Sequence, residues 1–168
     1  MIKVLGDELI RSVRGSAEAK SAADVPDAIK HPALRQLYHY WLDKRGDRVM
    51  PAPDEIDPVE LKFILGNLML IDVTHDPLDF TMRLHGTNLV QRTGVDLTGK
   101  GEKDAPSPGT ARIAVGDFTY VVENREPFHR ELNQLIDDSM WRYEGLALPL
   151  SVAGSRVDRL VVGVIHVI

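Results

Sequence analysis

The stretch NLMLIDVTHDPLDFTMRLHGT, residues 67–87, decides the fold of this chain. Residues 68–73 within it are apolar at almost every position, which is typical of a strand that is covered on both faces. After a tight turn at residues 76–79, residues 80–85 alternate between apolar and polar side chains. The stretch therefore predicts an antiparallel hairpin whose second strand has one apolar face, made by Phe80, Met82 and Leu84.

Three further strands are predicted later in the chain. Residues 160–168, LVVGVIHVI, are again apolar at almost every position, whereas residues 128–133, FHRELN, are polar enough for the edge of a sheet. Residues 141–150, WRYEGLALPL, are intermediate, with large side chains on both faces. Because the most apolar strands need cover on both faces, we place the first and the last strand at the centre of a five-stranded antiparallel sheet.

Helical patterns account for the segments around these strands. A helix opens at His31 and Pro32 and ends at Gly46, and residues 87–93 and 110–124 predict two more. Asp57 followed by Pro58 is a good helix start and predicts a shorter helix over residues 58–65. The apolar stripe of the first helix comprises Leu34, Leu37, Tyr38, Trp41 and Leu42.

The first 27 residues are expected to form a leader and linker before a folded domain of residues 28–168. Residues 14–24, RGSAEAKSAAD, are small, polar and without periodicity, which is typical of a flexible linker. The leader contains no apolar core of a secretory signal, and no segment has the length and apolarity of a membrane span. We therefore expect a cytoplasmic protein with no membrane partner. A short amphipathic leader helix is predicted by the helical spacing of Ile2, Leu5, Leu9 and Val13.

Several motifs in order resemble those of a known family. The segment LYHYWLDKRGDRVMPAPDEIDPVEL, residues 37–61, is followed by the hairpin, by GTNLVQRTGVDLTGK at residues 86–100, and by RYEGLALPLS and RVDRLVVGVIHVI near the end. Together they resemble a proteobacterial family of single-domain PAS proteins, whose members begin with a Trp-bearing helix and continue through RGDR-x-MP and a helix that starts at DP. The resemblance covers roughly residues 29–168.

This resemblance implies both a fold and a function. The implied fold is a PAS-like α/β (α+β) domain, with a five-stranded antiparallel sheet of order 2-1-5-4-3, flanking helices and an N-terminal helical extension. The implied function is a non-enzymatic sensor or signalling module that binds a small ligand, an unidentified signalling protein, or both. Two alternatives stay open: a small α+β enzyme of unknown reaction, and a purely structural dimerisation module.

Composition limits the partners and cofactors. The chain has 168 residues, of which 43% are hydrophobic and 27% charged, as expected for one domain with a substantial core. A net charge of -5 argues against a nucleic-acid partner. The absence of cysteine excludes thiolate metal sites and the flavin-adduct and thioester-chromophore chemistries of some PAS relatives. Haem-binding PAS relatives use a histidine on the helix that corresponds to residues 110–126, where this chain has none, so we expect no cofactor.

Few residues are candidates for catalysis or metal binding. His129 and Glu131 share a strand face, but a metal site needs at least one further ligand, so we expect no metal. Ser151, Asp158 and His166 have the residue types of a hydrolytic triad. No nucleophile-elbow motif surrounds the serine, so we expect no catalytic residues.

The predicted ligand site lies between the long helix and the sheet. The helix over residues 110–124 has more apolar surface than one stripe requires. Trp141 and Tyr143 share a strand face and each has a polar tip, while Thr87 and Gln91 lie one helical turn apart. For any single residue, filling the core is the alternative role. We expect a small, mostly apolar ligand to contact Thr87, Gln91, Tyr120, Trp141 and Tyr143.

Two expectations concern the outer face of the sheet. Arg83 is a charge within a strand that either faces solvent or pairs with an acid of a helix that lies across the sheet, and we expect the pairing. The two central strands also need cover on this face. We expect the Trp41 helix to cover part of it and a homodimer to cover the remainder.

Overall fold

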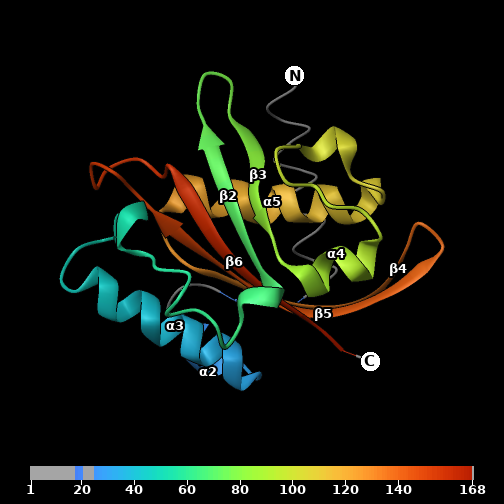
Figure 1. Ribbon diagram of the computed structural model, residues 1–168, viewed down its shortest axis with the longest axis horizontal. Coiled ribbons are helices and arrows are strands. Elements are labelled where there is room, and N and C mark those ends of the chain that lie inside the picture. Colours follow the sequence, from blue (N-terminus) through green and yellow to red (C-terminus); the bar gives the residue numbers. More distant parts are fainter. Residues whose placement is uncertain (1–17, 21–24, 168) are drawn as a thin grey trace.

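The computed structural model describes residues 18–20 and 25–167, which form a six-stranded antiparallel sheet and several helices (Figure 1). The sheet order is β1-β4-β5-β6-β2-β3. The leader helix predicted from Ile2, Leu5, Leu9 and Val13 falls outside the described residues. The strands are β1 (Glu18–Lys20), β2 (Leu68–Thr74), β3 (Asp79–His85), β4 (Phe128–Ile136), β5 (Ser139–Leu150) and β6 (Arg159–His166).

The five strands predicted from the sequence are β2 to β6, and their order is the expected one. Read from the β3 edge, the order β3-β2-β6-β5-β4 corresponds to 2-1-5-4-3. The two most apolar strands, β2 and β6, are neighbours in the centre and pair from Leu68↔Gly163 to Asp72↔Arg159. The PAS-like five-stranded antiparallel sheet is therefore confirmed.

The sequence pattern does not predict β1. Its three residues pair with β4, from Glu18 opposite Glu131 to Lys20 opposite His129. The interpretation of residues 18–20 as linker is wrong, because pairing with an open sheet edge uses backbone groups and requires no apolar pattern. As a result, β4 is not the edge of the sheet along its first residues.

A β-bulge at Arg83 changes which side chains of β3 share a face. Leu84 pairs with Leu70, whereas Met82 pairs with the next residue of β2, Ile71, so Arg83 is an extra residue in the ladder. Leu84 therefore lies on the opposite face of the sheet from Phe80 and Met82. The predicted common face of the three residues is wrong for Leu84, because a period of two cannot reveal an inserted residue.

The longest N-terminal helix, α3 (Pro32–Arg45), forms where it is predicted because both of its ends are capped. The side chain of His31 accepts a 3.1 Å hydrogen bond from the Ala33 N–H, and Pro32 occupies the first turn. Gly46 ends the helix with a φ of 57°, a left-handed value that glycine adopts readily. A four-residue helix, α2 (Val25–Ala28), precedes it, and its first residue is fully buried.

α3 covers part of the outer face of the central strands, as expected. It approaches β6 closely at Gly163, where a Cβ atom would lie 2.6 Å from Leu34 and 3.0 Å from Leu37. Trp41, which is 1% exposed, donates from Nε1 to the Pro149 carbonyl oxygen of β5 at 2.9 Å. The apolar stripe of α3 therefore packs on the sheet.

The connection from α3 to β2 consists of turns and two short 3-10 helices, η1 (Pro53–Glu55) and η2 (Leu65–Asn67). The Asp57 carboxylate accepts from the Val59 N–H at 2.9 Å, as a helix cap does. The backbone bonds that follow span three residues, with Leu61 N–H to Pro58 at 3.1 Å and Ile64 N–H to Leu61 at 3.0 Å. The α-helix predicted over residues 58–65 is therefore wrong. Three-residue turns place Leu61 and Ile64 on one side, where both are buried.

The opposite face of the sheet is covered by α4 (Thr87–Thr93), η3 (Glu102–Asp104) and α5 (Pro108–Asn124). In Figure 1, α5 runs behind the strands and crosses β2 and β3. The two predicted helices between β3 and β4 are therefore present. Among the described residues, no helix combines the length and apolarity needed to cross a bilayer.

Arg83 does not pair with a helix, contrary to expectation. Its Nη1 lies 3.2 Å from Asp72 of the neighbouring strand β2, and Arg159 of β6 binds the same carboxylate at 2.9 Å. The bulge places Arg83 on the same face as Asp72, within reach of its neighbour in the sheet. All three side chains are at least partly exposed, so the pairs contribute little to stability.

Candidate ligand-binding site

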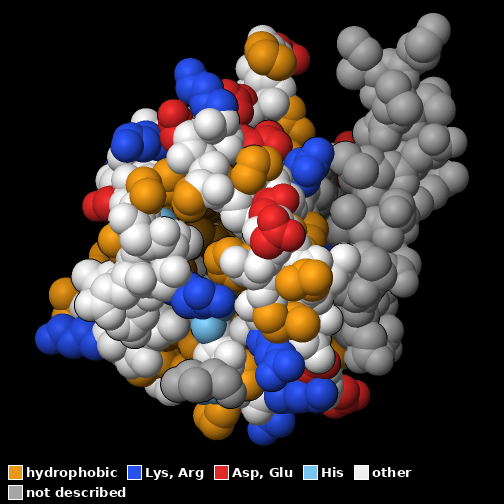
Figure 2. All heavy atoms as spheres, turned by 90° about the vertical axis from the view of Figure 1, so that its right-hand side faces the viewer, with side chains coloured by type: hydrophobic (Ala, Val, Ile, Leu, Met, Phe, Trp, Pro, Cys, Tyr) orange, Lys and Arg blue, Asp and Glu red, His pale blue; other side chains and the backbone are white. Residues whose placement is uncertain are grey.

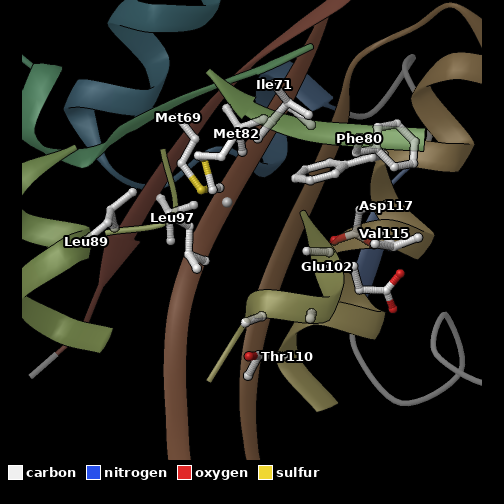
Figure 3. Close-up of a pocket in the computed structure, with 18 of the residues that line it drawn as sticks. Met69, Ile71, Phe80, Met82, Leu89, Leu97, Glu102, Thr110, Val115 and Asp117 are labelled. Atoms are coloured by element: carbon white, nitrogen blue, oxygen red, sulfur yellow. The ribbon is translucent and has the colours of Figure 1, made fainter. Parts of the chain in front are cut away.

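A cavity of about 220 Å³ lies between the sheet and the layer of α4, η3 and α5. This volume is below the roughly 300–1,000 Å³ of sites for drug-sized molecules, so it suits a small ligand. Figure 3 shows Met69 and Met82 close together near Leu97, with Phe80 and Val115 further along the cavity. Figure 2 shows hydrophobic side chains inside a hollow on one face of the molecule, with charged side chains around it. The apolar lining includes Met69, Ile71, Met82, Leu89, Val115 and Phe118.

The loop between α4 and α5 forms one wall of the cavity, and β3 holds it in place. The Met82 N–H donates to the Lys100 carbonyl at 2.8 Å, and the Gly99 N–H donates to the Met82 carbonyl at 2.6 Å. The Leu97 N–H donates to Nδ1 of His85 at 3.1 Å. Burial lowers the pKa of His85, which favours the neutral imidazole that can accept this bond.

The start of α5 is fixed by Asp137 in the turn between β4 and β5. One carboxylate oxygen of Asp137 accepts from the Ser107 hydroxyl and from the Gly109 N–H, each at 2.8 Å. The Gly109 bond and then the Ser107 bond lower the pKa of Asp137. A Cβ atom at Gly109 would lie 2.4 Å from the Ile136 side chain, which would then have to move. The first turn of α5 is therefore tied to the end of the β4–β5 hairpin.

An ion pair between Arg130 of β4 and Asp117 of α5 lies in the cavity wall. Arg130 Nε donates to one carboxylate oxygen at 2.7 Å and Nη2 to the other at 2.6 Å, and the Arg130 side chain is only 2% exposed. Burial alone lowers the pKa of Arg130, but the hydrogen bond and the charge of Asp117 outweigh it and raise the pKa. Among the described residues, the third guanidinium nitrogen, Nη1, has no partner.

Three rings form a polar strip on the floor of the cavity. Trp141 and Tyr143 come from β5, and His166 of β6 contacts both rings, with centroids 5.9 and 5.7 Å away. Burial raises the pKa of the Tyr143 phenol and lowers that of His166, so both rings are held neutral. Within the described part of the chain, Trp141 Nε1 and His166 Nδ1 have no hydrogen-bond partner.

The family model described as "PAS domain" matches residues 29–124, which run from just before α3 to the end of α5. The chain belongs to the PAS domain family. The matched part includes α4, α5 and the β2–β3 hairpin, three of the elements that enclose the cavity. No curated protein shows significant similarity to the chain.

Solved structures of two PAS domains and of a light-oxygen-voltage receptor are also similar to the chain. The PAS domain of BvgS from Bordetella pertussis is 19% identical, with a TM-score of 0.49, and the match covers 67% of this chain and 88% of that one. The PAS domain of the histidine kinase ThkA is 15% identical, with a TM-score of 0.40 and coverage of 58% and 98%. An RNA-binding light-oxygen-voltage receptor is 16% identical, with a TM-score of 0.43 and coverage of 68% and 33%.

Two of the five predicted ligand-binding residues of this PAS domain line the cavity, Trp141 and Tyr143. Thr87 and Gln91 lie on the exposed side of α4, outside the lining. Their spacing shows that they share a helix face, but it does not show which face of α4 turns inward. The inward face of α4 instead carries Leu89 and Thr93.

Tyr120 also lies outside the cavity lining. Its hydroxyl donates to the Glu126 carboxylate, and its ring packs against Phe128 at a centroid distance of 5.0 Å.

The ion pair of Arg130 and Asp117 was missed by sequence reasoning. The sequence of β4 does indicate that Arg130 is buried, because Phe128, Arg130 and Leu132 alternate along the strand and share one face.

A second buried pair of this PAS domain, His129 and Glu144, lies on the α3 face of the sheet, 2.8 Å apart. The Glu144 carboxylate also accepts from the backbone N–H groups of Lys30 at 2.7 Å and His31 at 2.8 Å, at the start of α3. Burial raises the pKa of Glu144, but the hydrogen bonds from Lys30, His129 and His31 outweigh it and lower the pKa. The main role of Glu144 is therefore to anchor α3.

His129, Glu131 and Glu144 also form the one group of three possible metal ligands found among the described residues, with ligand atoms within 4.8 Å of one another. The His129 Nε2 atom and the two carboxylates are already engaged within the protein, whereas His129 Nδ1 has no partner among the described residues. Glu144 accepts three hydrogen bonds, and a Glu131 oxygen lies 2.9 Å from the Lys30 amine. We therefore assign the cluster a structural role.

The residue types of a hydrolytic triad are not brought together. His166 pairs with Tyr143 of β5, whereas Ser151 lies just after the end of this strand, eight residues or about 26 Å further along. The Ser151 hydroxyl accepts from the Gly154 N–H at 2.9 Å, and Asp158 accepts from the Val152 N–H at 2.7 Å. These two side chains stabilise the loop between β5 and β6.

Proposed function

We propose that this PAS domain is a non-enzymatic sensor module, which binds a small, mostly apolar molecule in the cavity and passes its presence to a signalling protein. The cavity of about 220 Å³ is the observation that supports this proposal. Protein interiors are close-packed and contain few voids larger than a water molecule. A purely structural dimerisation module has no use for such a space.

The buried titratable groups favour binding over catalysis. Arg130 and Asp117 hold each other, and Glu144 holds the start of α3. A general acid or base must instead have a proton-exchanging atom free to reach the substrate. Of the unpartnered atoms on lining residues, Arg130 Nη1 and Trp141 Nε1 can only donate hydrogen bonds, and His166 Nδ1 bonds no second titratable group among the described residues, so the lining suits recognition.

The route from ligand to partner runs through the β4–β5 hairpin. A ligand in the cavity contacts the first turns of α5, which Asp137 ties to the hairpin turn. Leu135 and Met140 of the same hairpin expose 64% and 47% of their surface. These side chains offer an apolar contact for a signalling protein or for a second copy of the chain. The homodimer predicted from the sequence would instead cover the outer face of the central strands.

The proposal is tested by filling the cavity. Ala114 lines the cavity from α5, so Ala114→Leu occupies part of it, whereas Ala153→Leu makes the same change in an exposed loop. Metabolites are screened against both variants and the parent by thermal shift. A ligand at a hundredfold excess over its Kd stabilises the parent by about 2.7 kcal/mol.

We expect hits that stabilise the parent and Ala153→Leu but not Ala114→Leu. A library without hits, or hits that Ala114→Leu binds as tightly as the parent, would argue that the cavity is not a ligand site. Ala114→Leu itself should fold, because the added side chain enters empty space and buries apolar surface.

A further inference from the structure

Three side chains that line the cavity each carry an unpartnered polar atom, and these atoms indicate what kind of ligand the cavity takes. Six buried side-chain atoms have no hydrogen-bond partner among the described residues, and three of them belong to cavity-lining residues: Arg130 Nη1, Trp141 Nε1 and His166 Nδ1. Buried polar groups in folded proteins are almost always paired. The cavity wall is therefore incomplete without a polar atom from a ligand or water.

Arg130 is the most demanding of the three. A guanidinium group has five N–H donors and no acceptor, and Asp117 takes the donors of Nε and one from Nη2. Three N–H groups remain, one on Nη2 and two on Nη1, and Nη1 has no partner although the side chain is only 2% exposed. Only an acceptor atom can satisfy them. The ligand must therefore bring an oxygen or nitrogen with a free lone pair to this end of the cavity.

The charges of the lining argue against an ionised ligand. Asp117 already neutralises Arg130, so a carboxylate placed at Nη1 would be repelled by Asp117 a few ångströms away. An ammonium group would find both oxygens of Asp117 bound to the guanidinium. The other charged residues of the lining are exposed, and they are Asp79, Lys100 and Glu102.

We infer that the ligand of this cavity is a small neutral carbonyl compound, such as a ketone or an ester, whose oxygen accepts from Arg130 Nη1 while its apolar body lies among Met82, Phe80 and Val115. This inference rests on the proposed function. A carbonyl oxygen satisfies the charged donor and adds no charge beside Asp117. Figure 3 shows the labelled side chains of Asp117 and Val115 on the same side of the cavity, so the polar anchor and the apolar wall are neighbours.

Four phenyl compounds of similar size test the ligand class by isothermal titration calorimetry: propiophenone, propylbenzene, hydrocinnamate and phenylpropylamine. They carry a ketone, no polar group, a carboxylate and an ammonium group, respectively. We expect the ketone to bind the parent about 10- to 100-fold more tightly than propylbenzene, the ratio that one hydrogen bond to a charged group supplies. Hydrocinnamate and phenylpropylamine should bind more weakly than the ketone.

The double variant Asp117→Leu with Arg130→Met isolates the anchor. It replaces the buried pair by apolar side chains of similar size, a change that proteins often tolerate. We expect it to bind propylbenzene at least as well as the parent does and to lose the preference for the ketone. The matched control is Arg142→Met, because Arg142 is exposed and bonds Asn133 on the outer face of the sheet. It should keep the parent's preference.

If the double variant does not fold, Arg130→Lys replaces it in the same binding test. Lysine keeps a cation for Asp117 but lacks the planar guanidinium and its Nη1 group. Equal affinity of the parent for ketone and propylbenzene, or a ketone preference that survives in the double variant, would overturn the carbonyl anchor. Tighter binding of hydrocinnamate would show that the ligand is an acid. No binding of any probe, together with no hit in the metabolite screen, would overturn the proposed function itself.

Discussion

Glu144 in β5 and His31 at the start of α3 are joined by a 2.8 Å hydrogen bond from a backbone N–H to a buried carboxylate. The same carboxylate accepts from Lys30 and contacts His129. A strand residue thus caps a helix that precedes it by more than 100 positions in the chain. The N-terminal end of α3 carries unpaired N–H groups and a partial positive charge, and both favour a carboxylate at this point.

Replacing Glu144 by Gln should destabilise the protein by about 1–3 kcal/mol, because hydrogen bonds to a buried charged acceptor become bonds to a neutral one. The measurement is urea denaturation near neutral pH. Glu131→Gln is the control, since Glu131 is partly exposed and pairs with Lys30, a contact that contributes only about 0–1 kcal/mol. Equal losses in the two variants would show that Glu144 does not anchor α3.

The stabilisation by Glu144 should also depend on pH. Its pKa in the folded protein is lower than the ordinary value of 4.5. Its contribution is therefore complete above that ordinary value and is lost as the pH falls through the folded-state pKa. The stability difference between the parent and Glu144→Gln should narrow as the pH falls from neutral to well below that ordinary value. Denaturation curves that keep a constant difference over this range would contradict the assignment.

Adding one methyl group at Gly163 should cost about 1–3 kcal/mol, because the new Cβ meets a closely packed core. It would lie 2.6 Å from Leu34 and 3.0 Å from Leu37 of α3. Gly145→Ala is a matched control in the neighbouring strand, where the nearest atom is a Tyr143 ring carbon at 3.6 Å. That variant should change stability by no more than about 1 kcal/mol, since alanine also restricts the unfolded chain. Chemical denaturation of both variants measures the difference.

Asp137→Ala should loosen the first turn of α5. The carboxylate that accepts from Ser107 and Gly109 is lost, so the backbone N–H of Gly109 should exchange faster with deuterium. Asp138→Ala is the control, because residues 137 and 138 both have positive φ, of 48° and 63°, and alanine is strained at either position. Equal exchange at Gly109 in the two variants would show that strain in the turn, and not the lost acceptor, causes the change.

Local signals in the sequence predict the elements whose ends and faces are set by neighbouring residues. α3 is an example, with its cap at His31 and its end at Gly46, and so are the apolar strands β2 and β6. The pairing of β1 and the bulge at Arg83 depend on backbone groups of another strand. No local pattern contains that information.

For the cavity, too, the sequence predicts only the features that neighbouring residues determine. Trp141 and Tyr143 line it because strand alternation fixes that they share a face. The partner of Arg130 could not be predicted, since Asp117 comes from a helix whose rotation is set by packing. Loop residues such as Leu97 reach the cavity only because β3 binds the loop, which spacing in the sequence does not indicate.

Two consecutive residues of β4 point to opposite sides of the sheet and hold different helices. His129 contacts the carboxylate that anchors α3, and Arg130 binds Asp117 of α5. Sliding β4 by one position would exchange the two side chains and break both attachments at once. The strand alignment is thus locked from both sides by polar contacts. A disturbance that enters through α5 can therefore reach α3 across the thickness of a single strand.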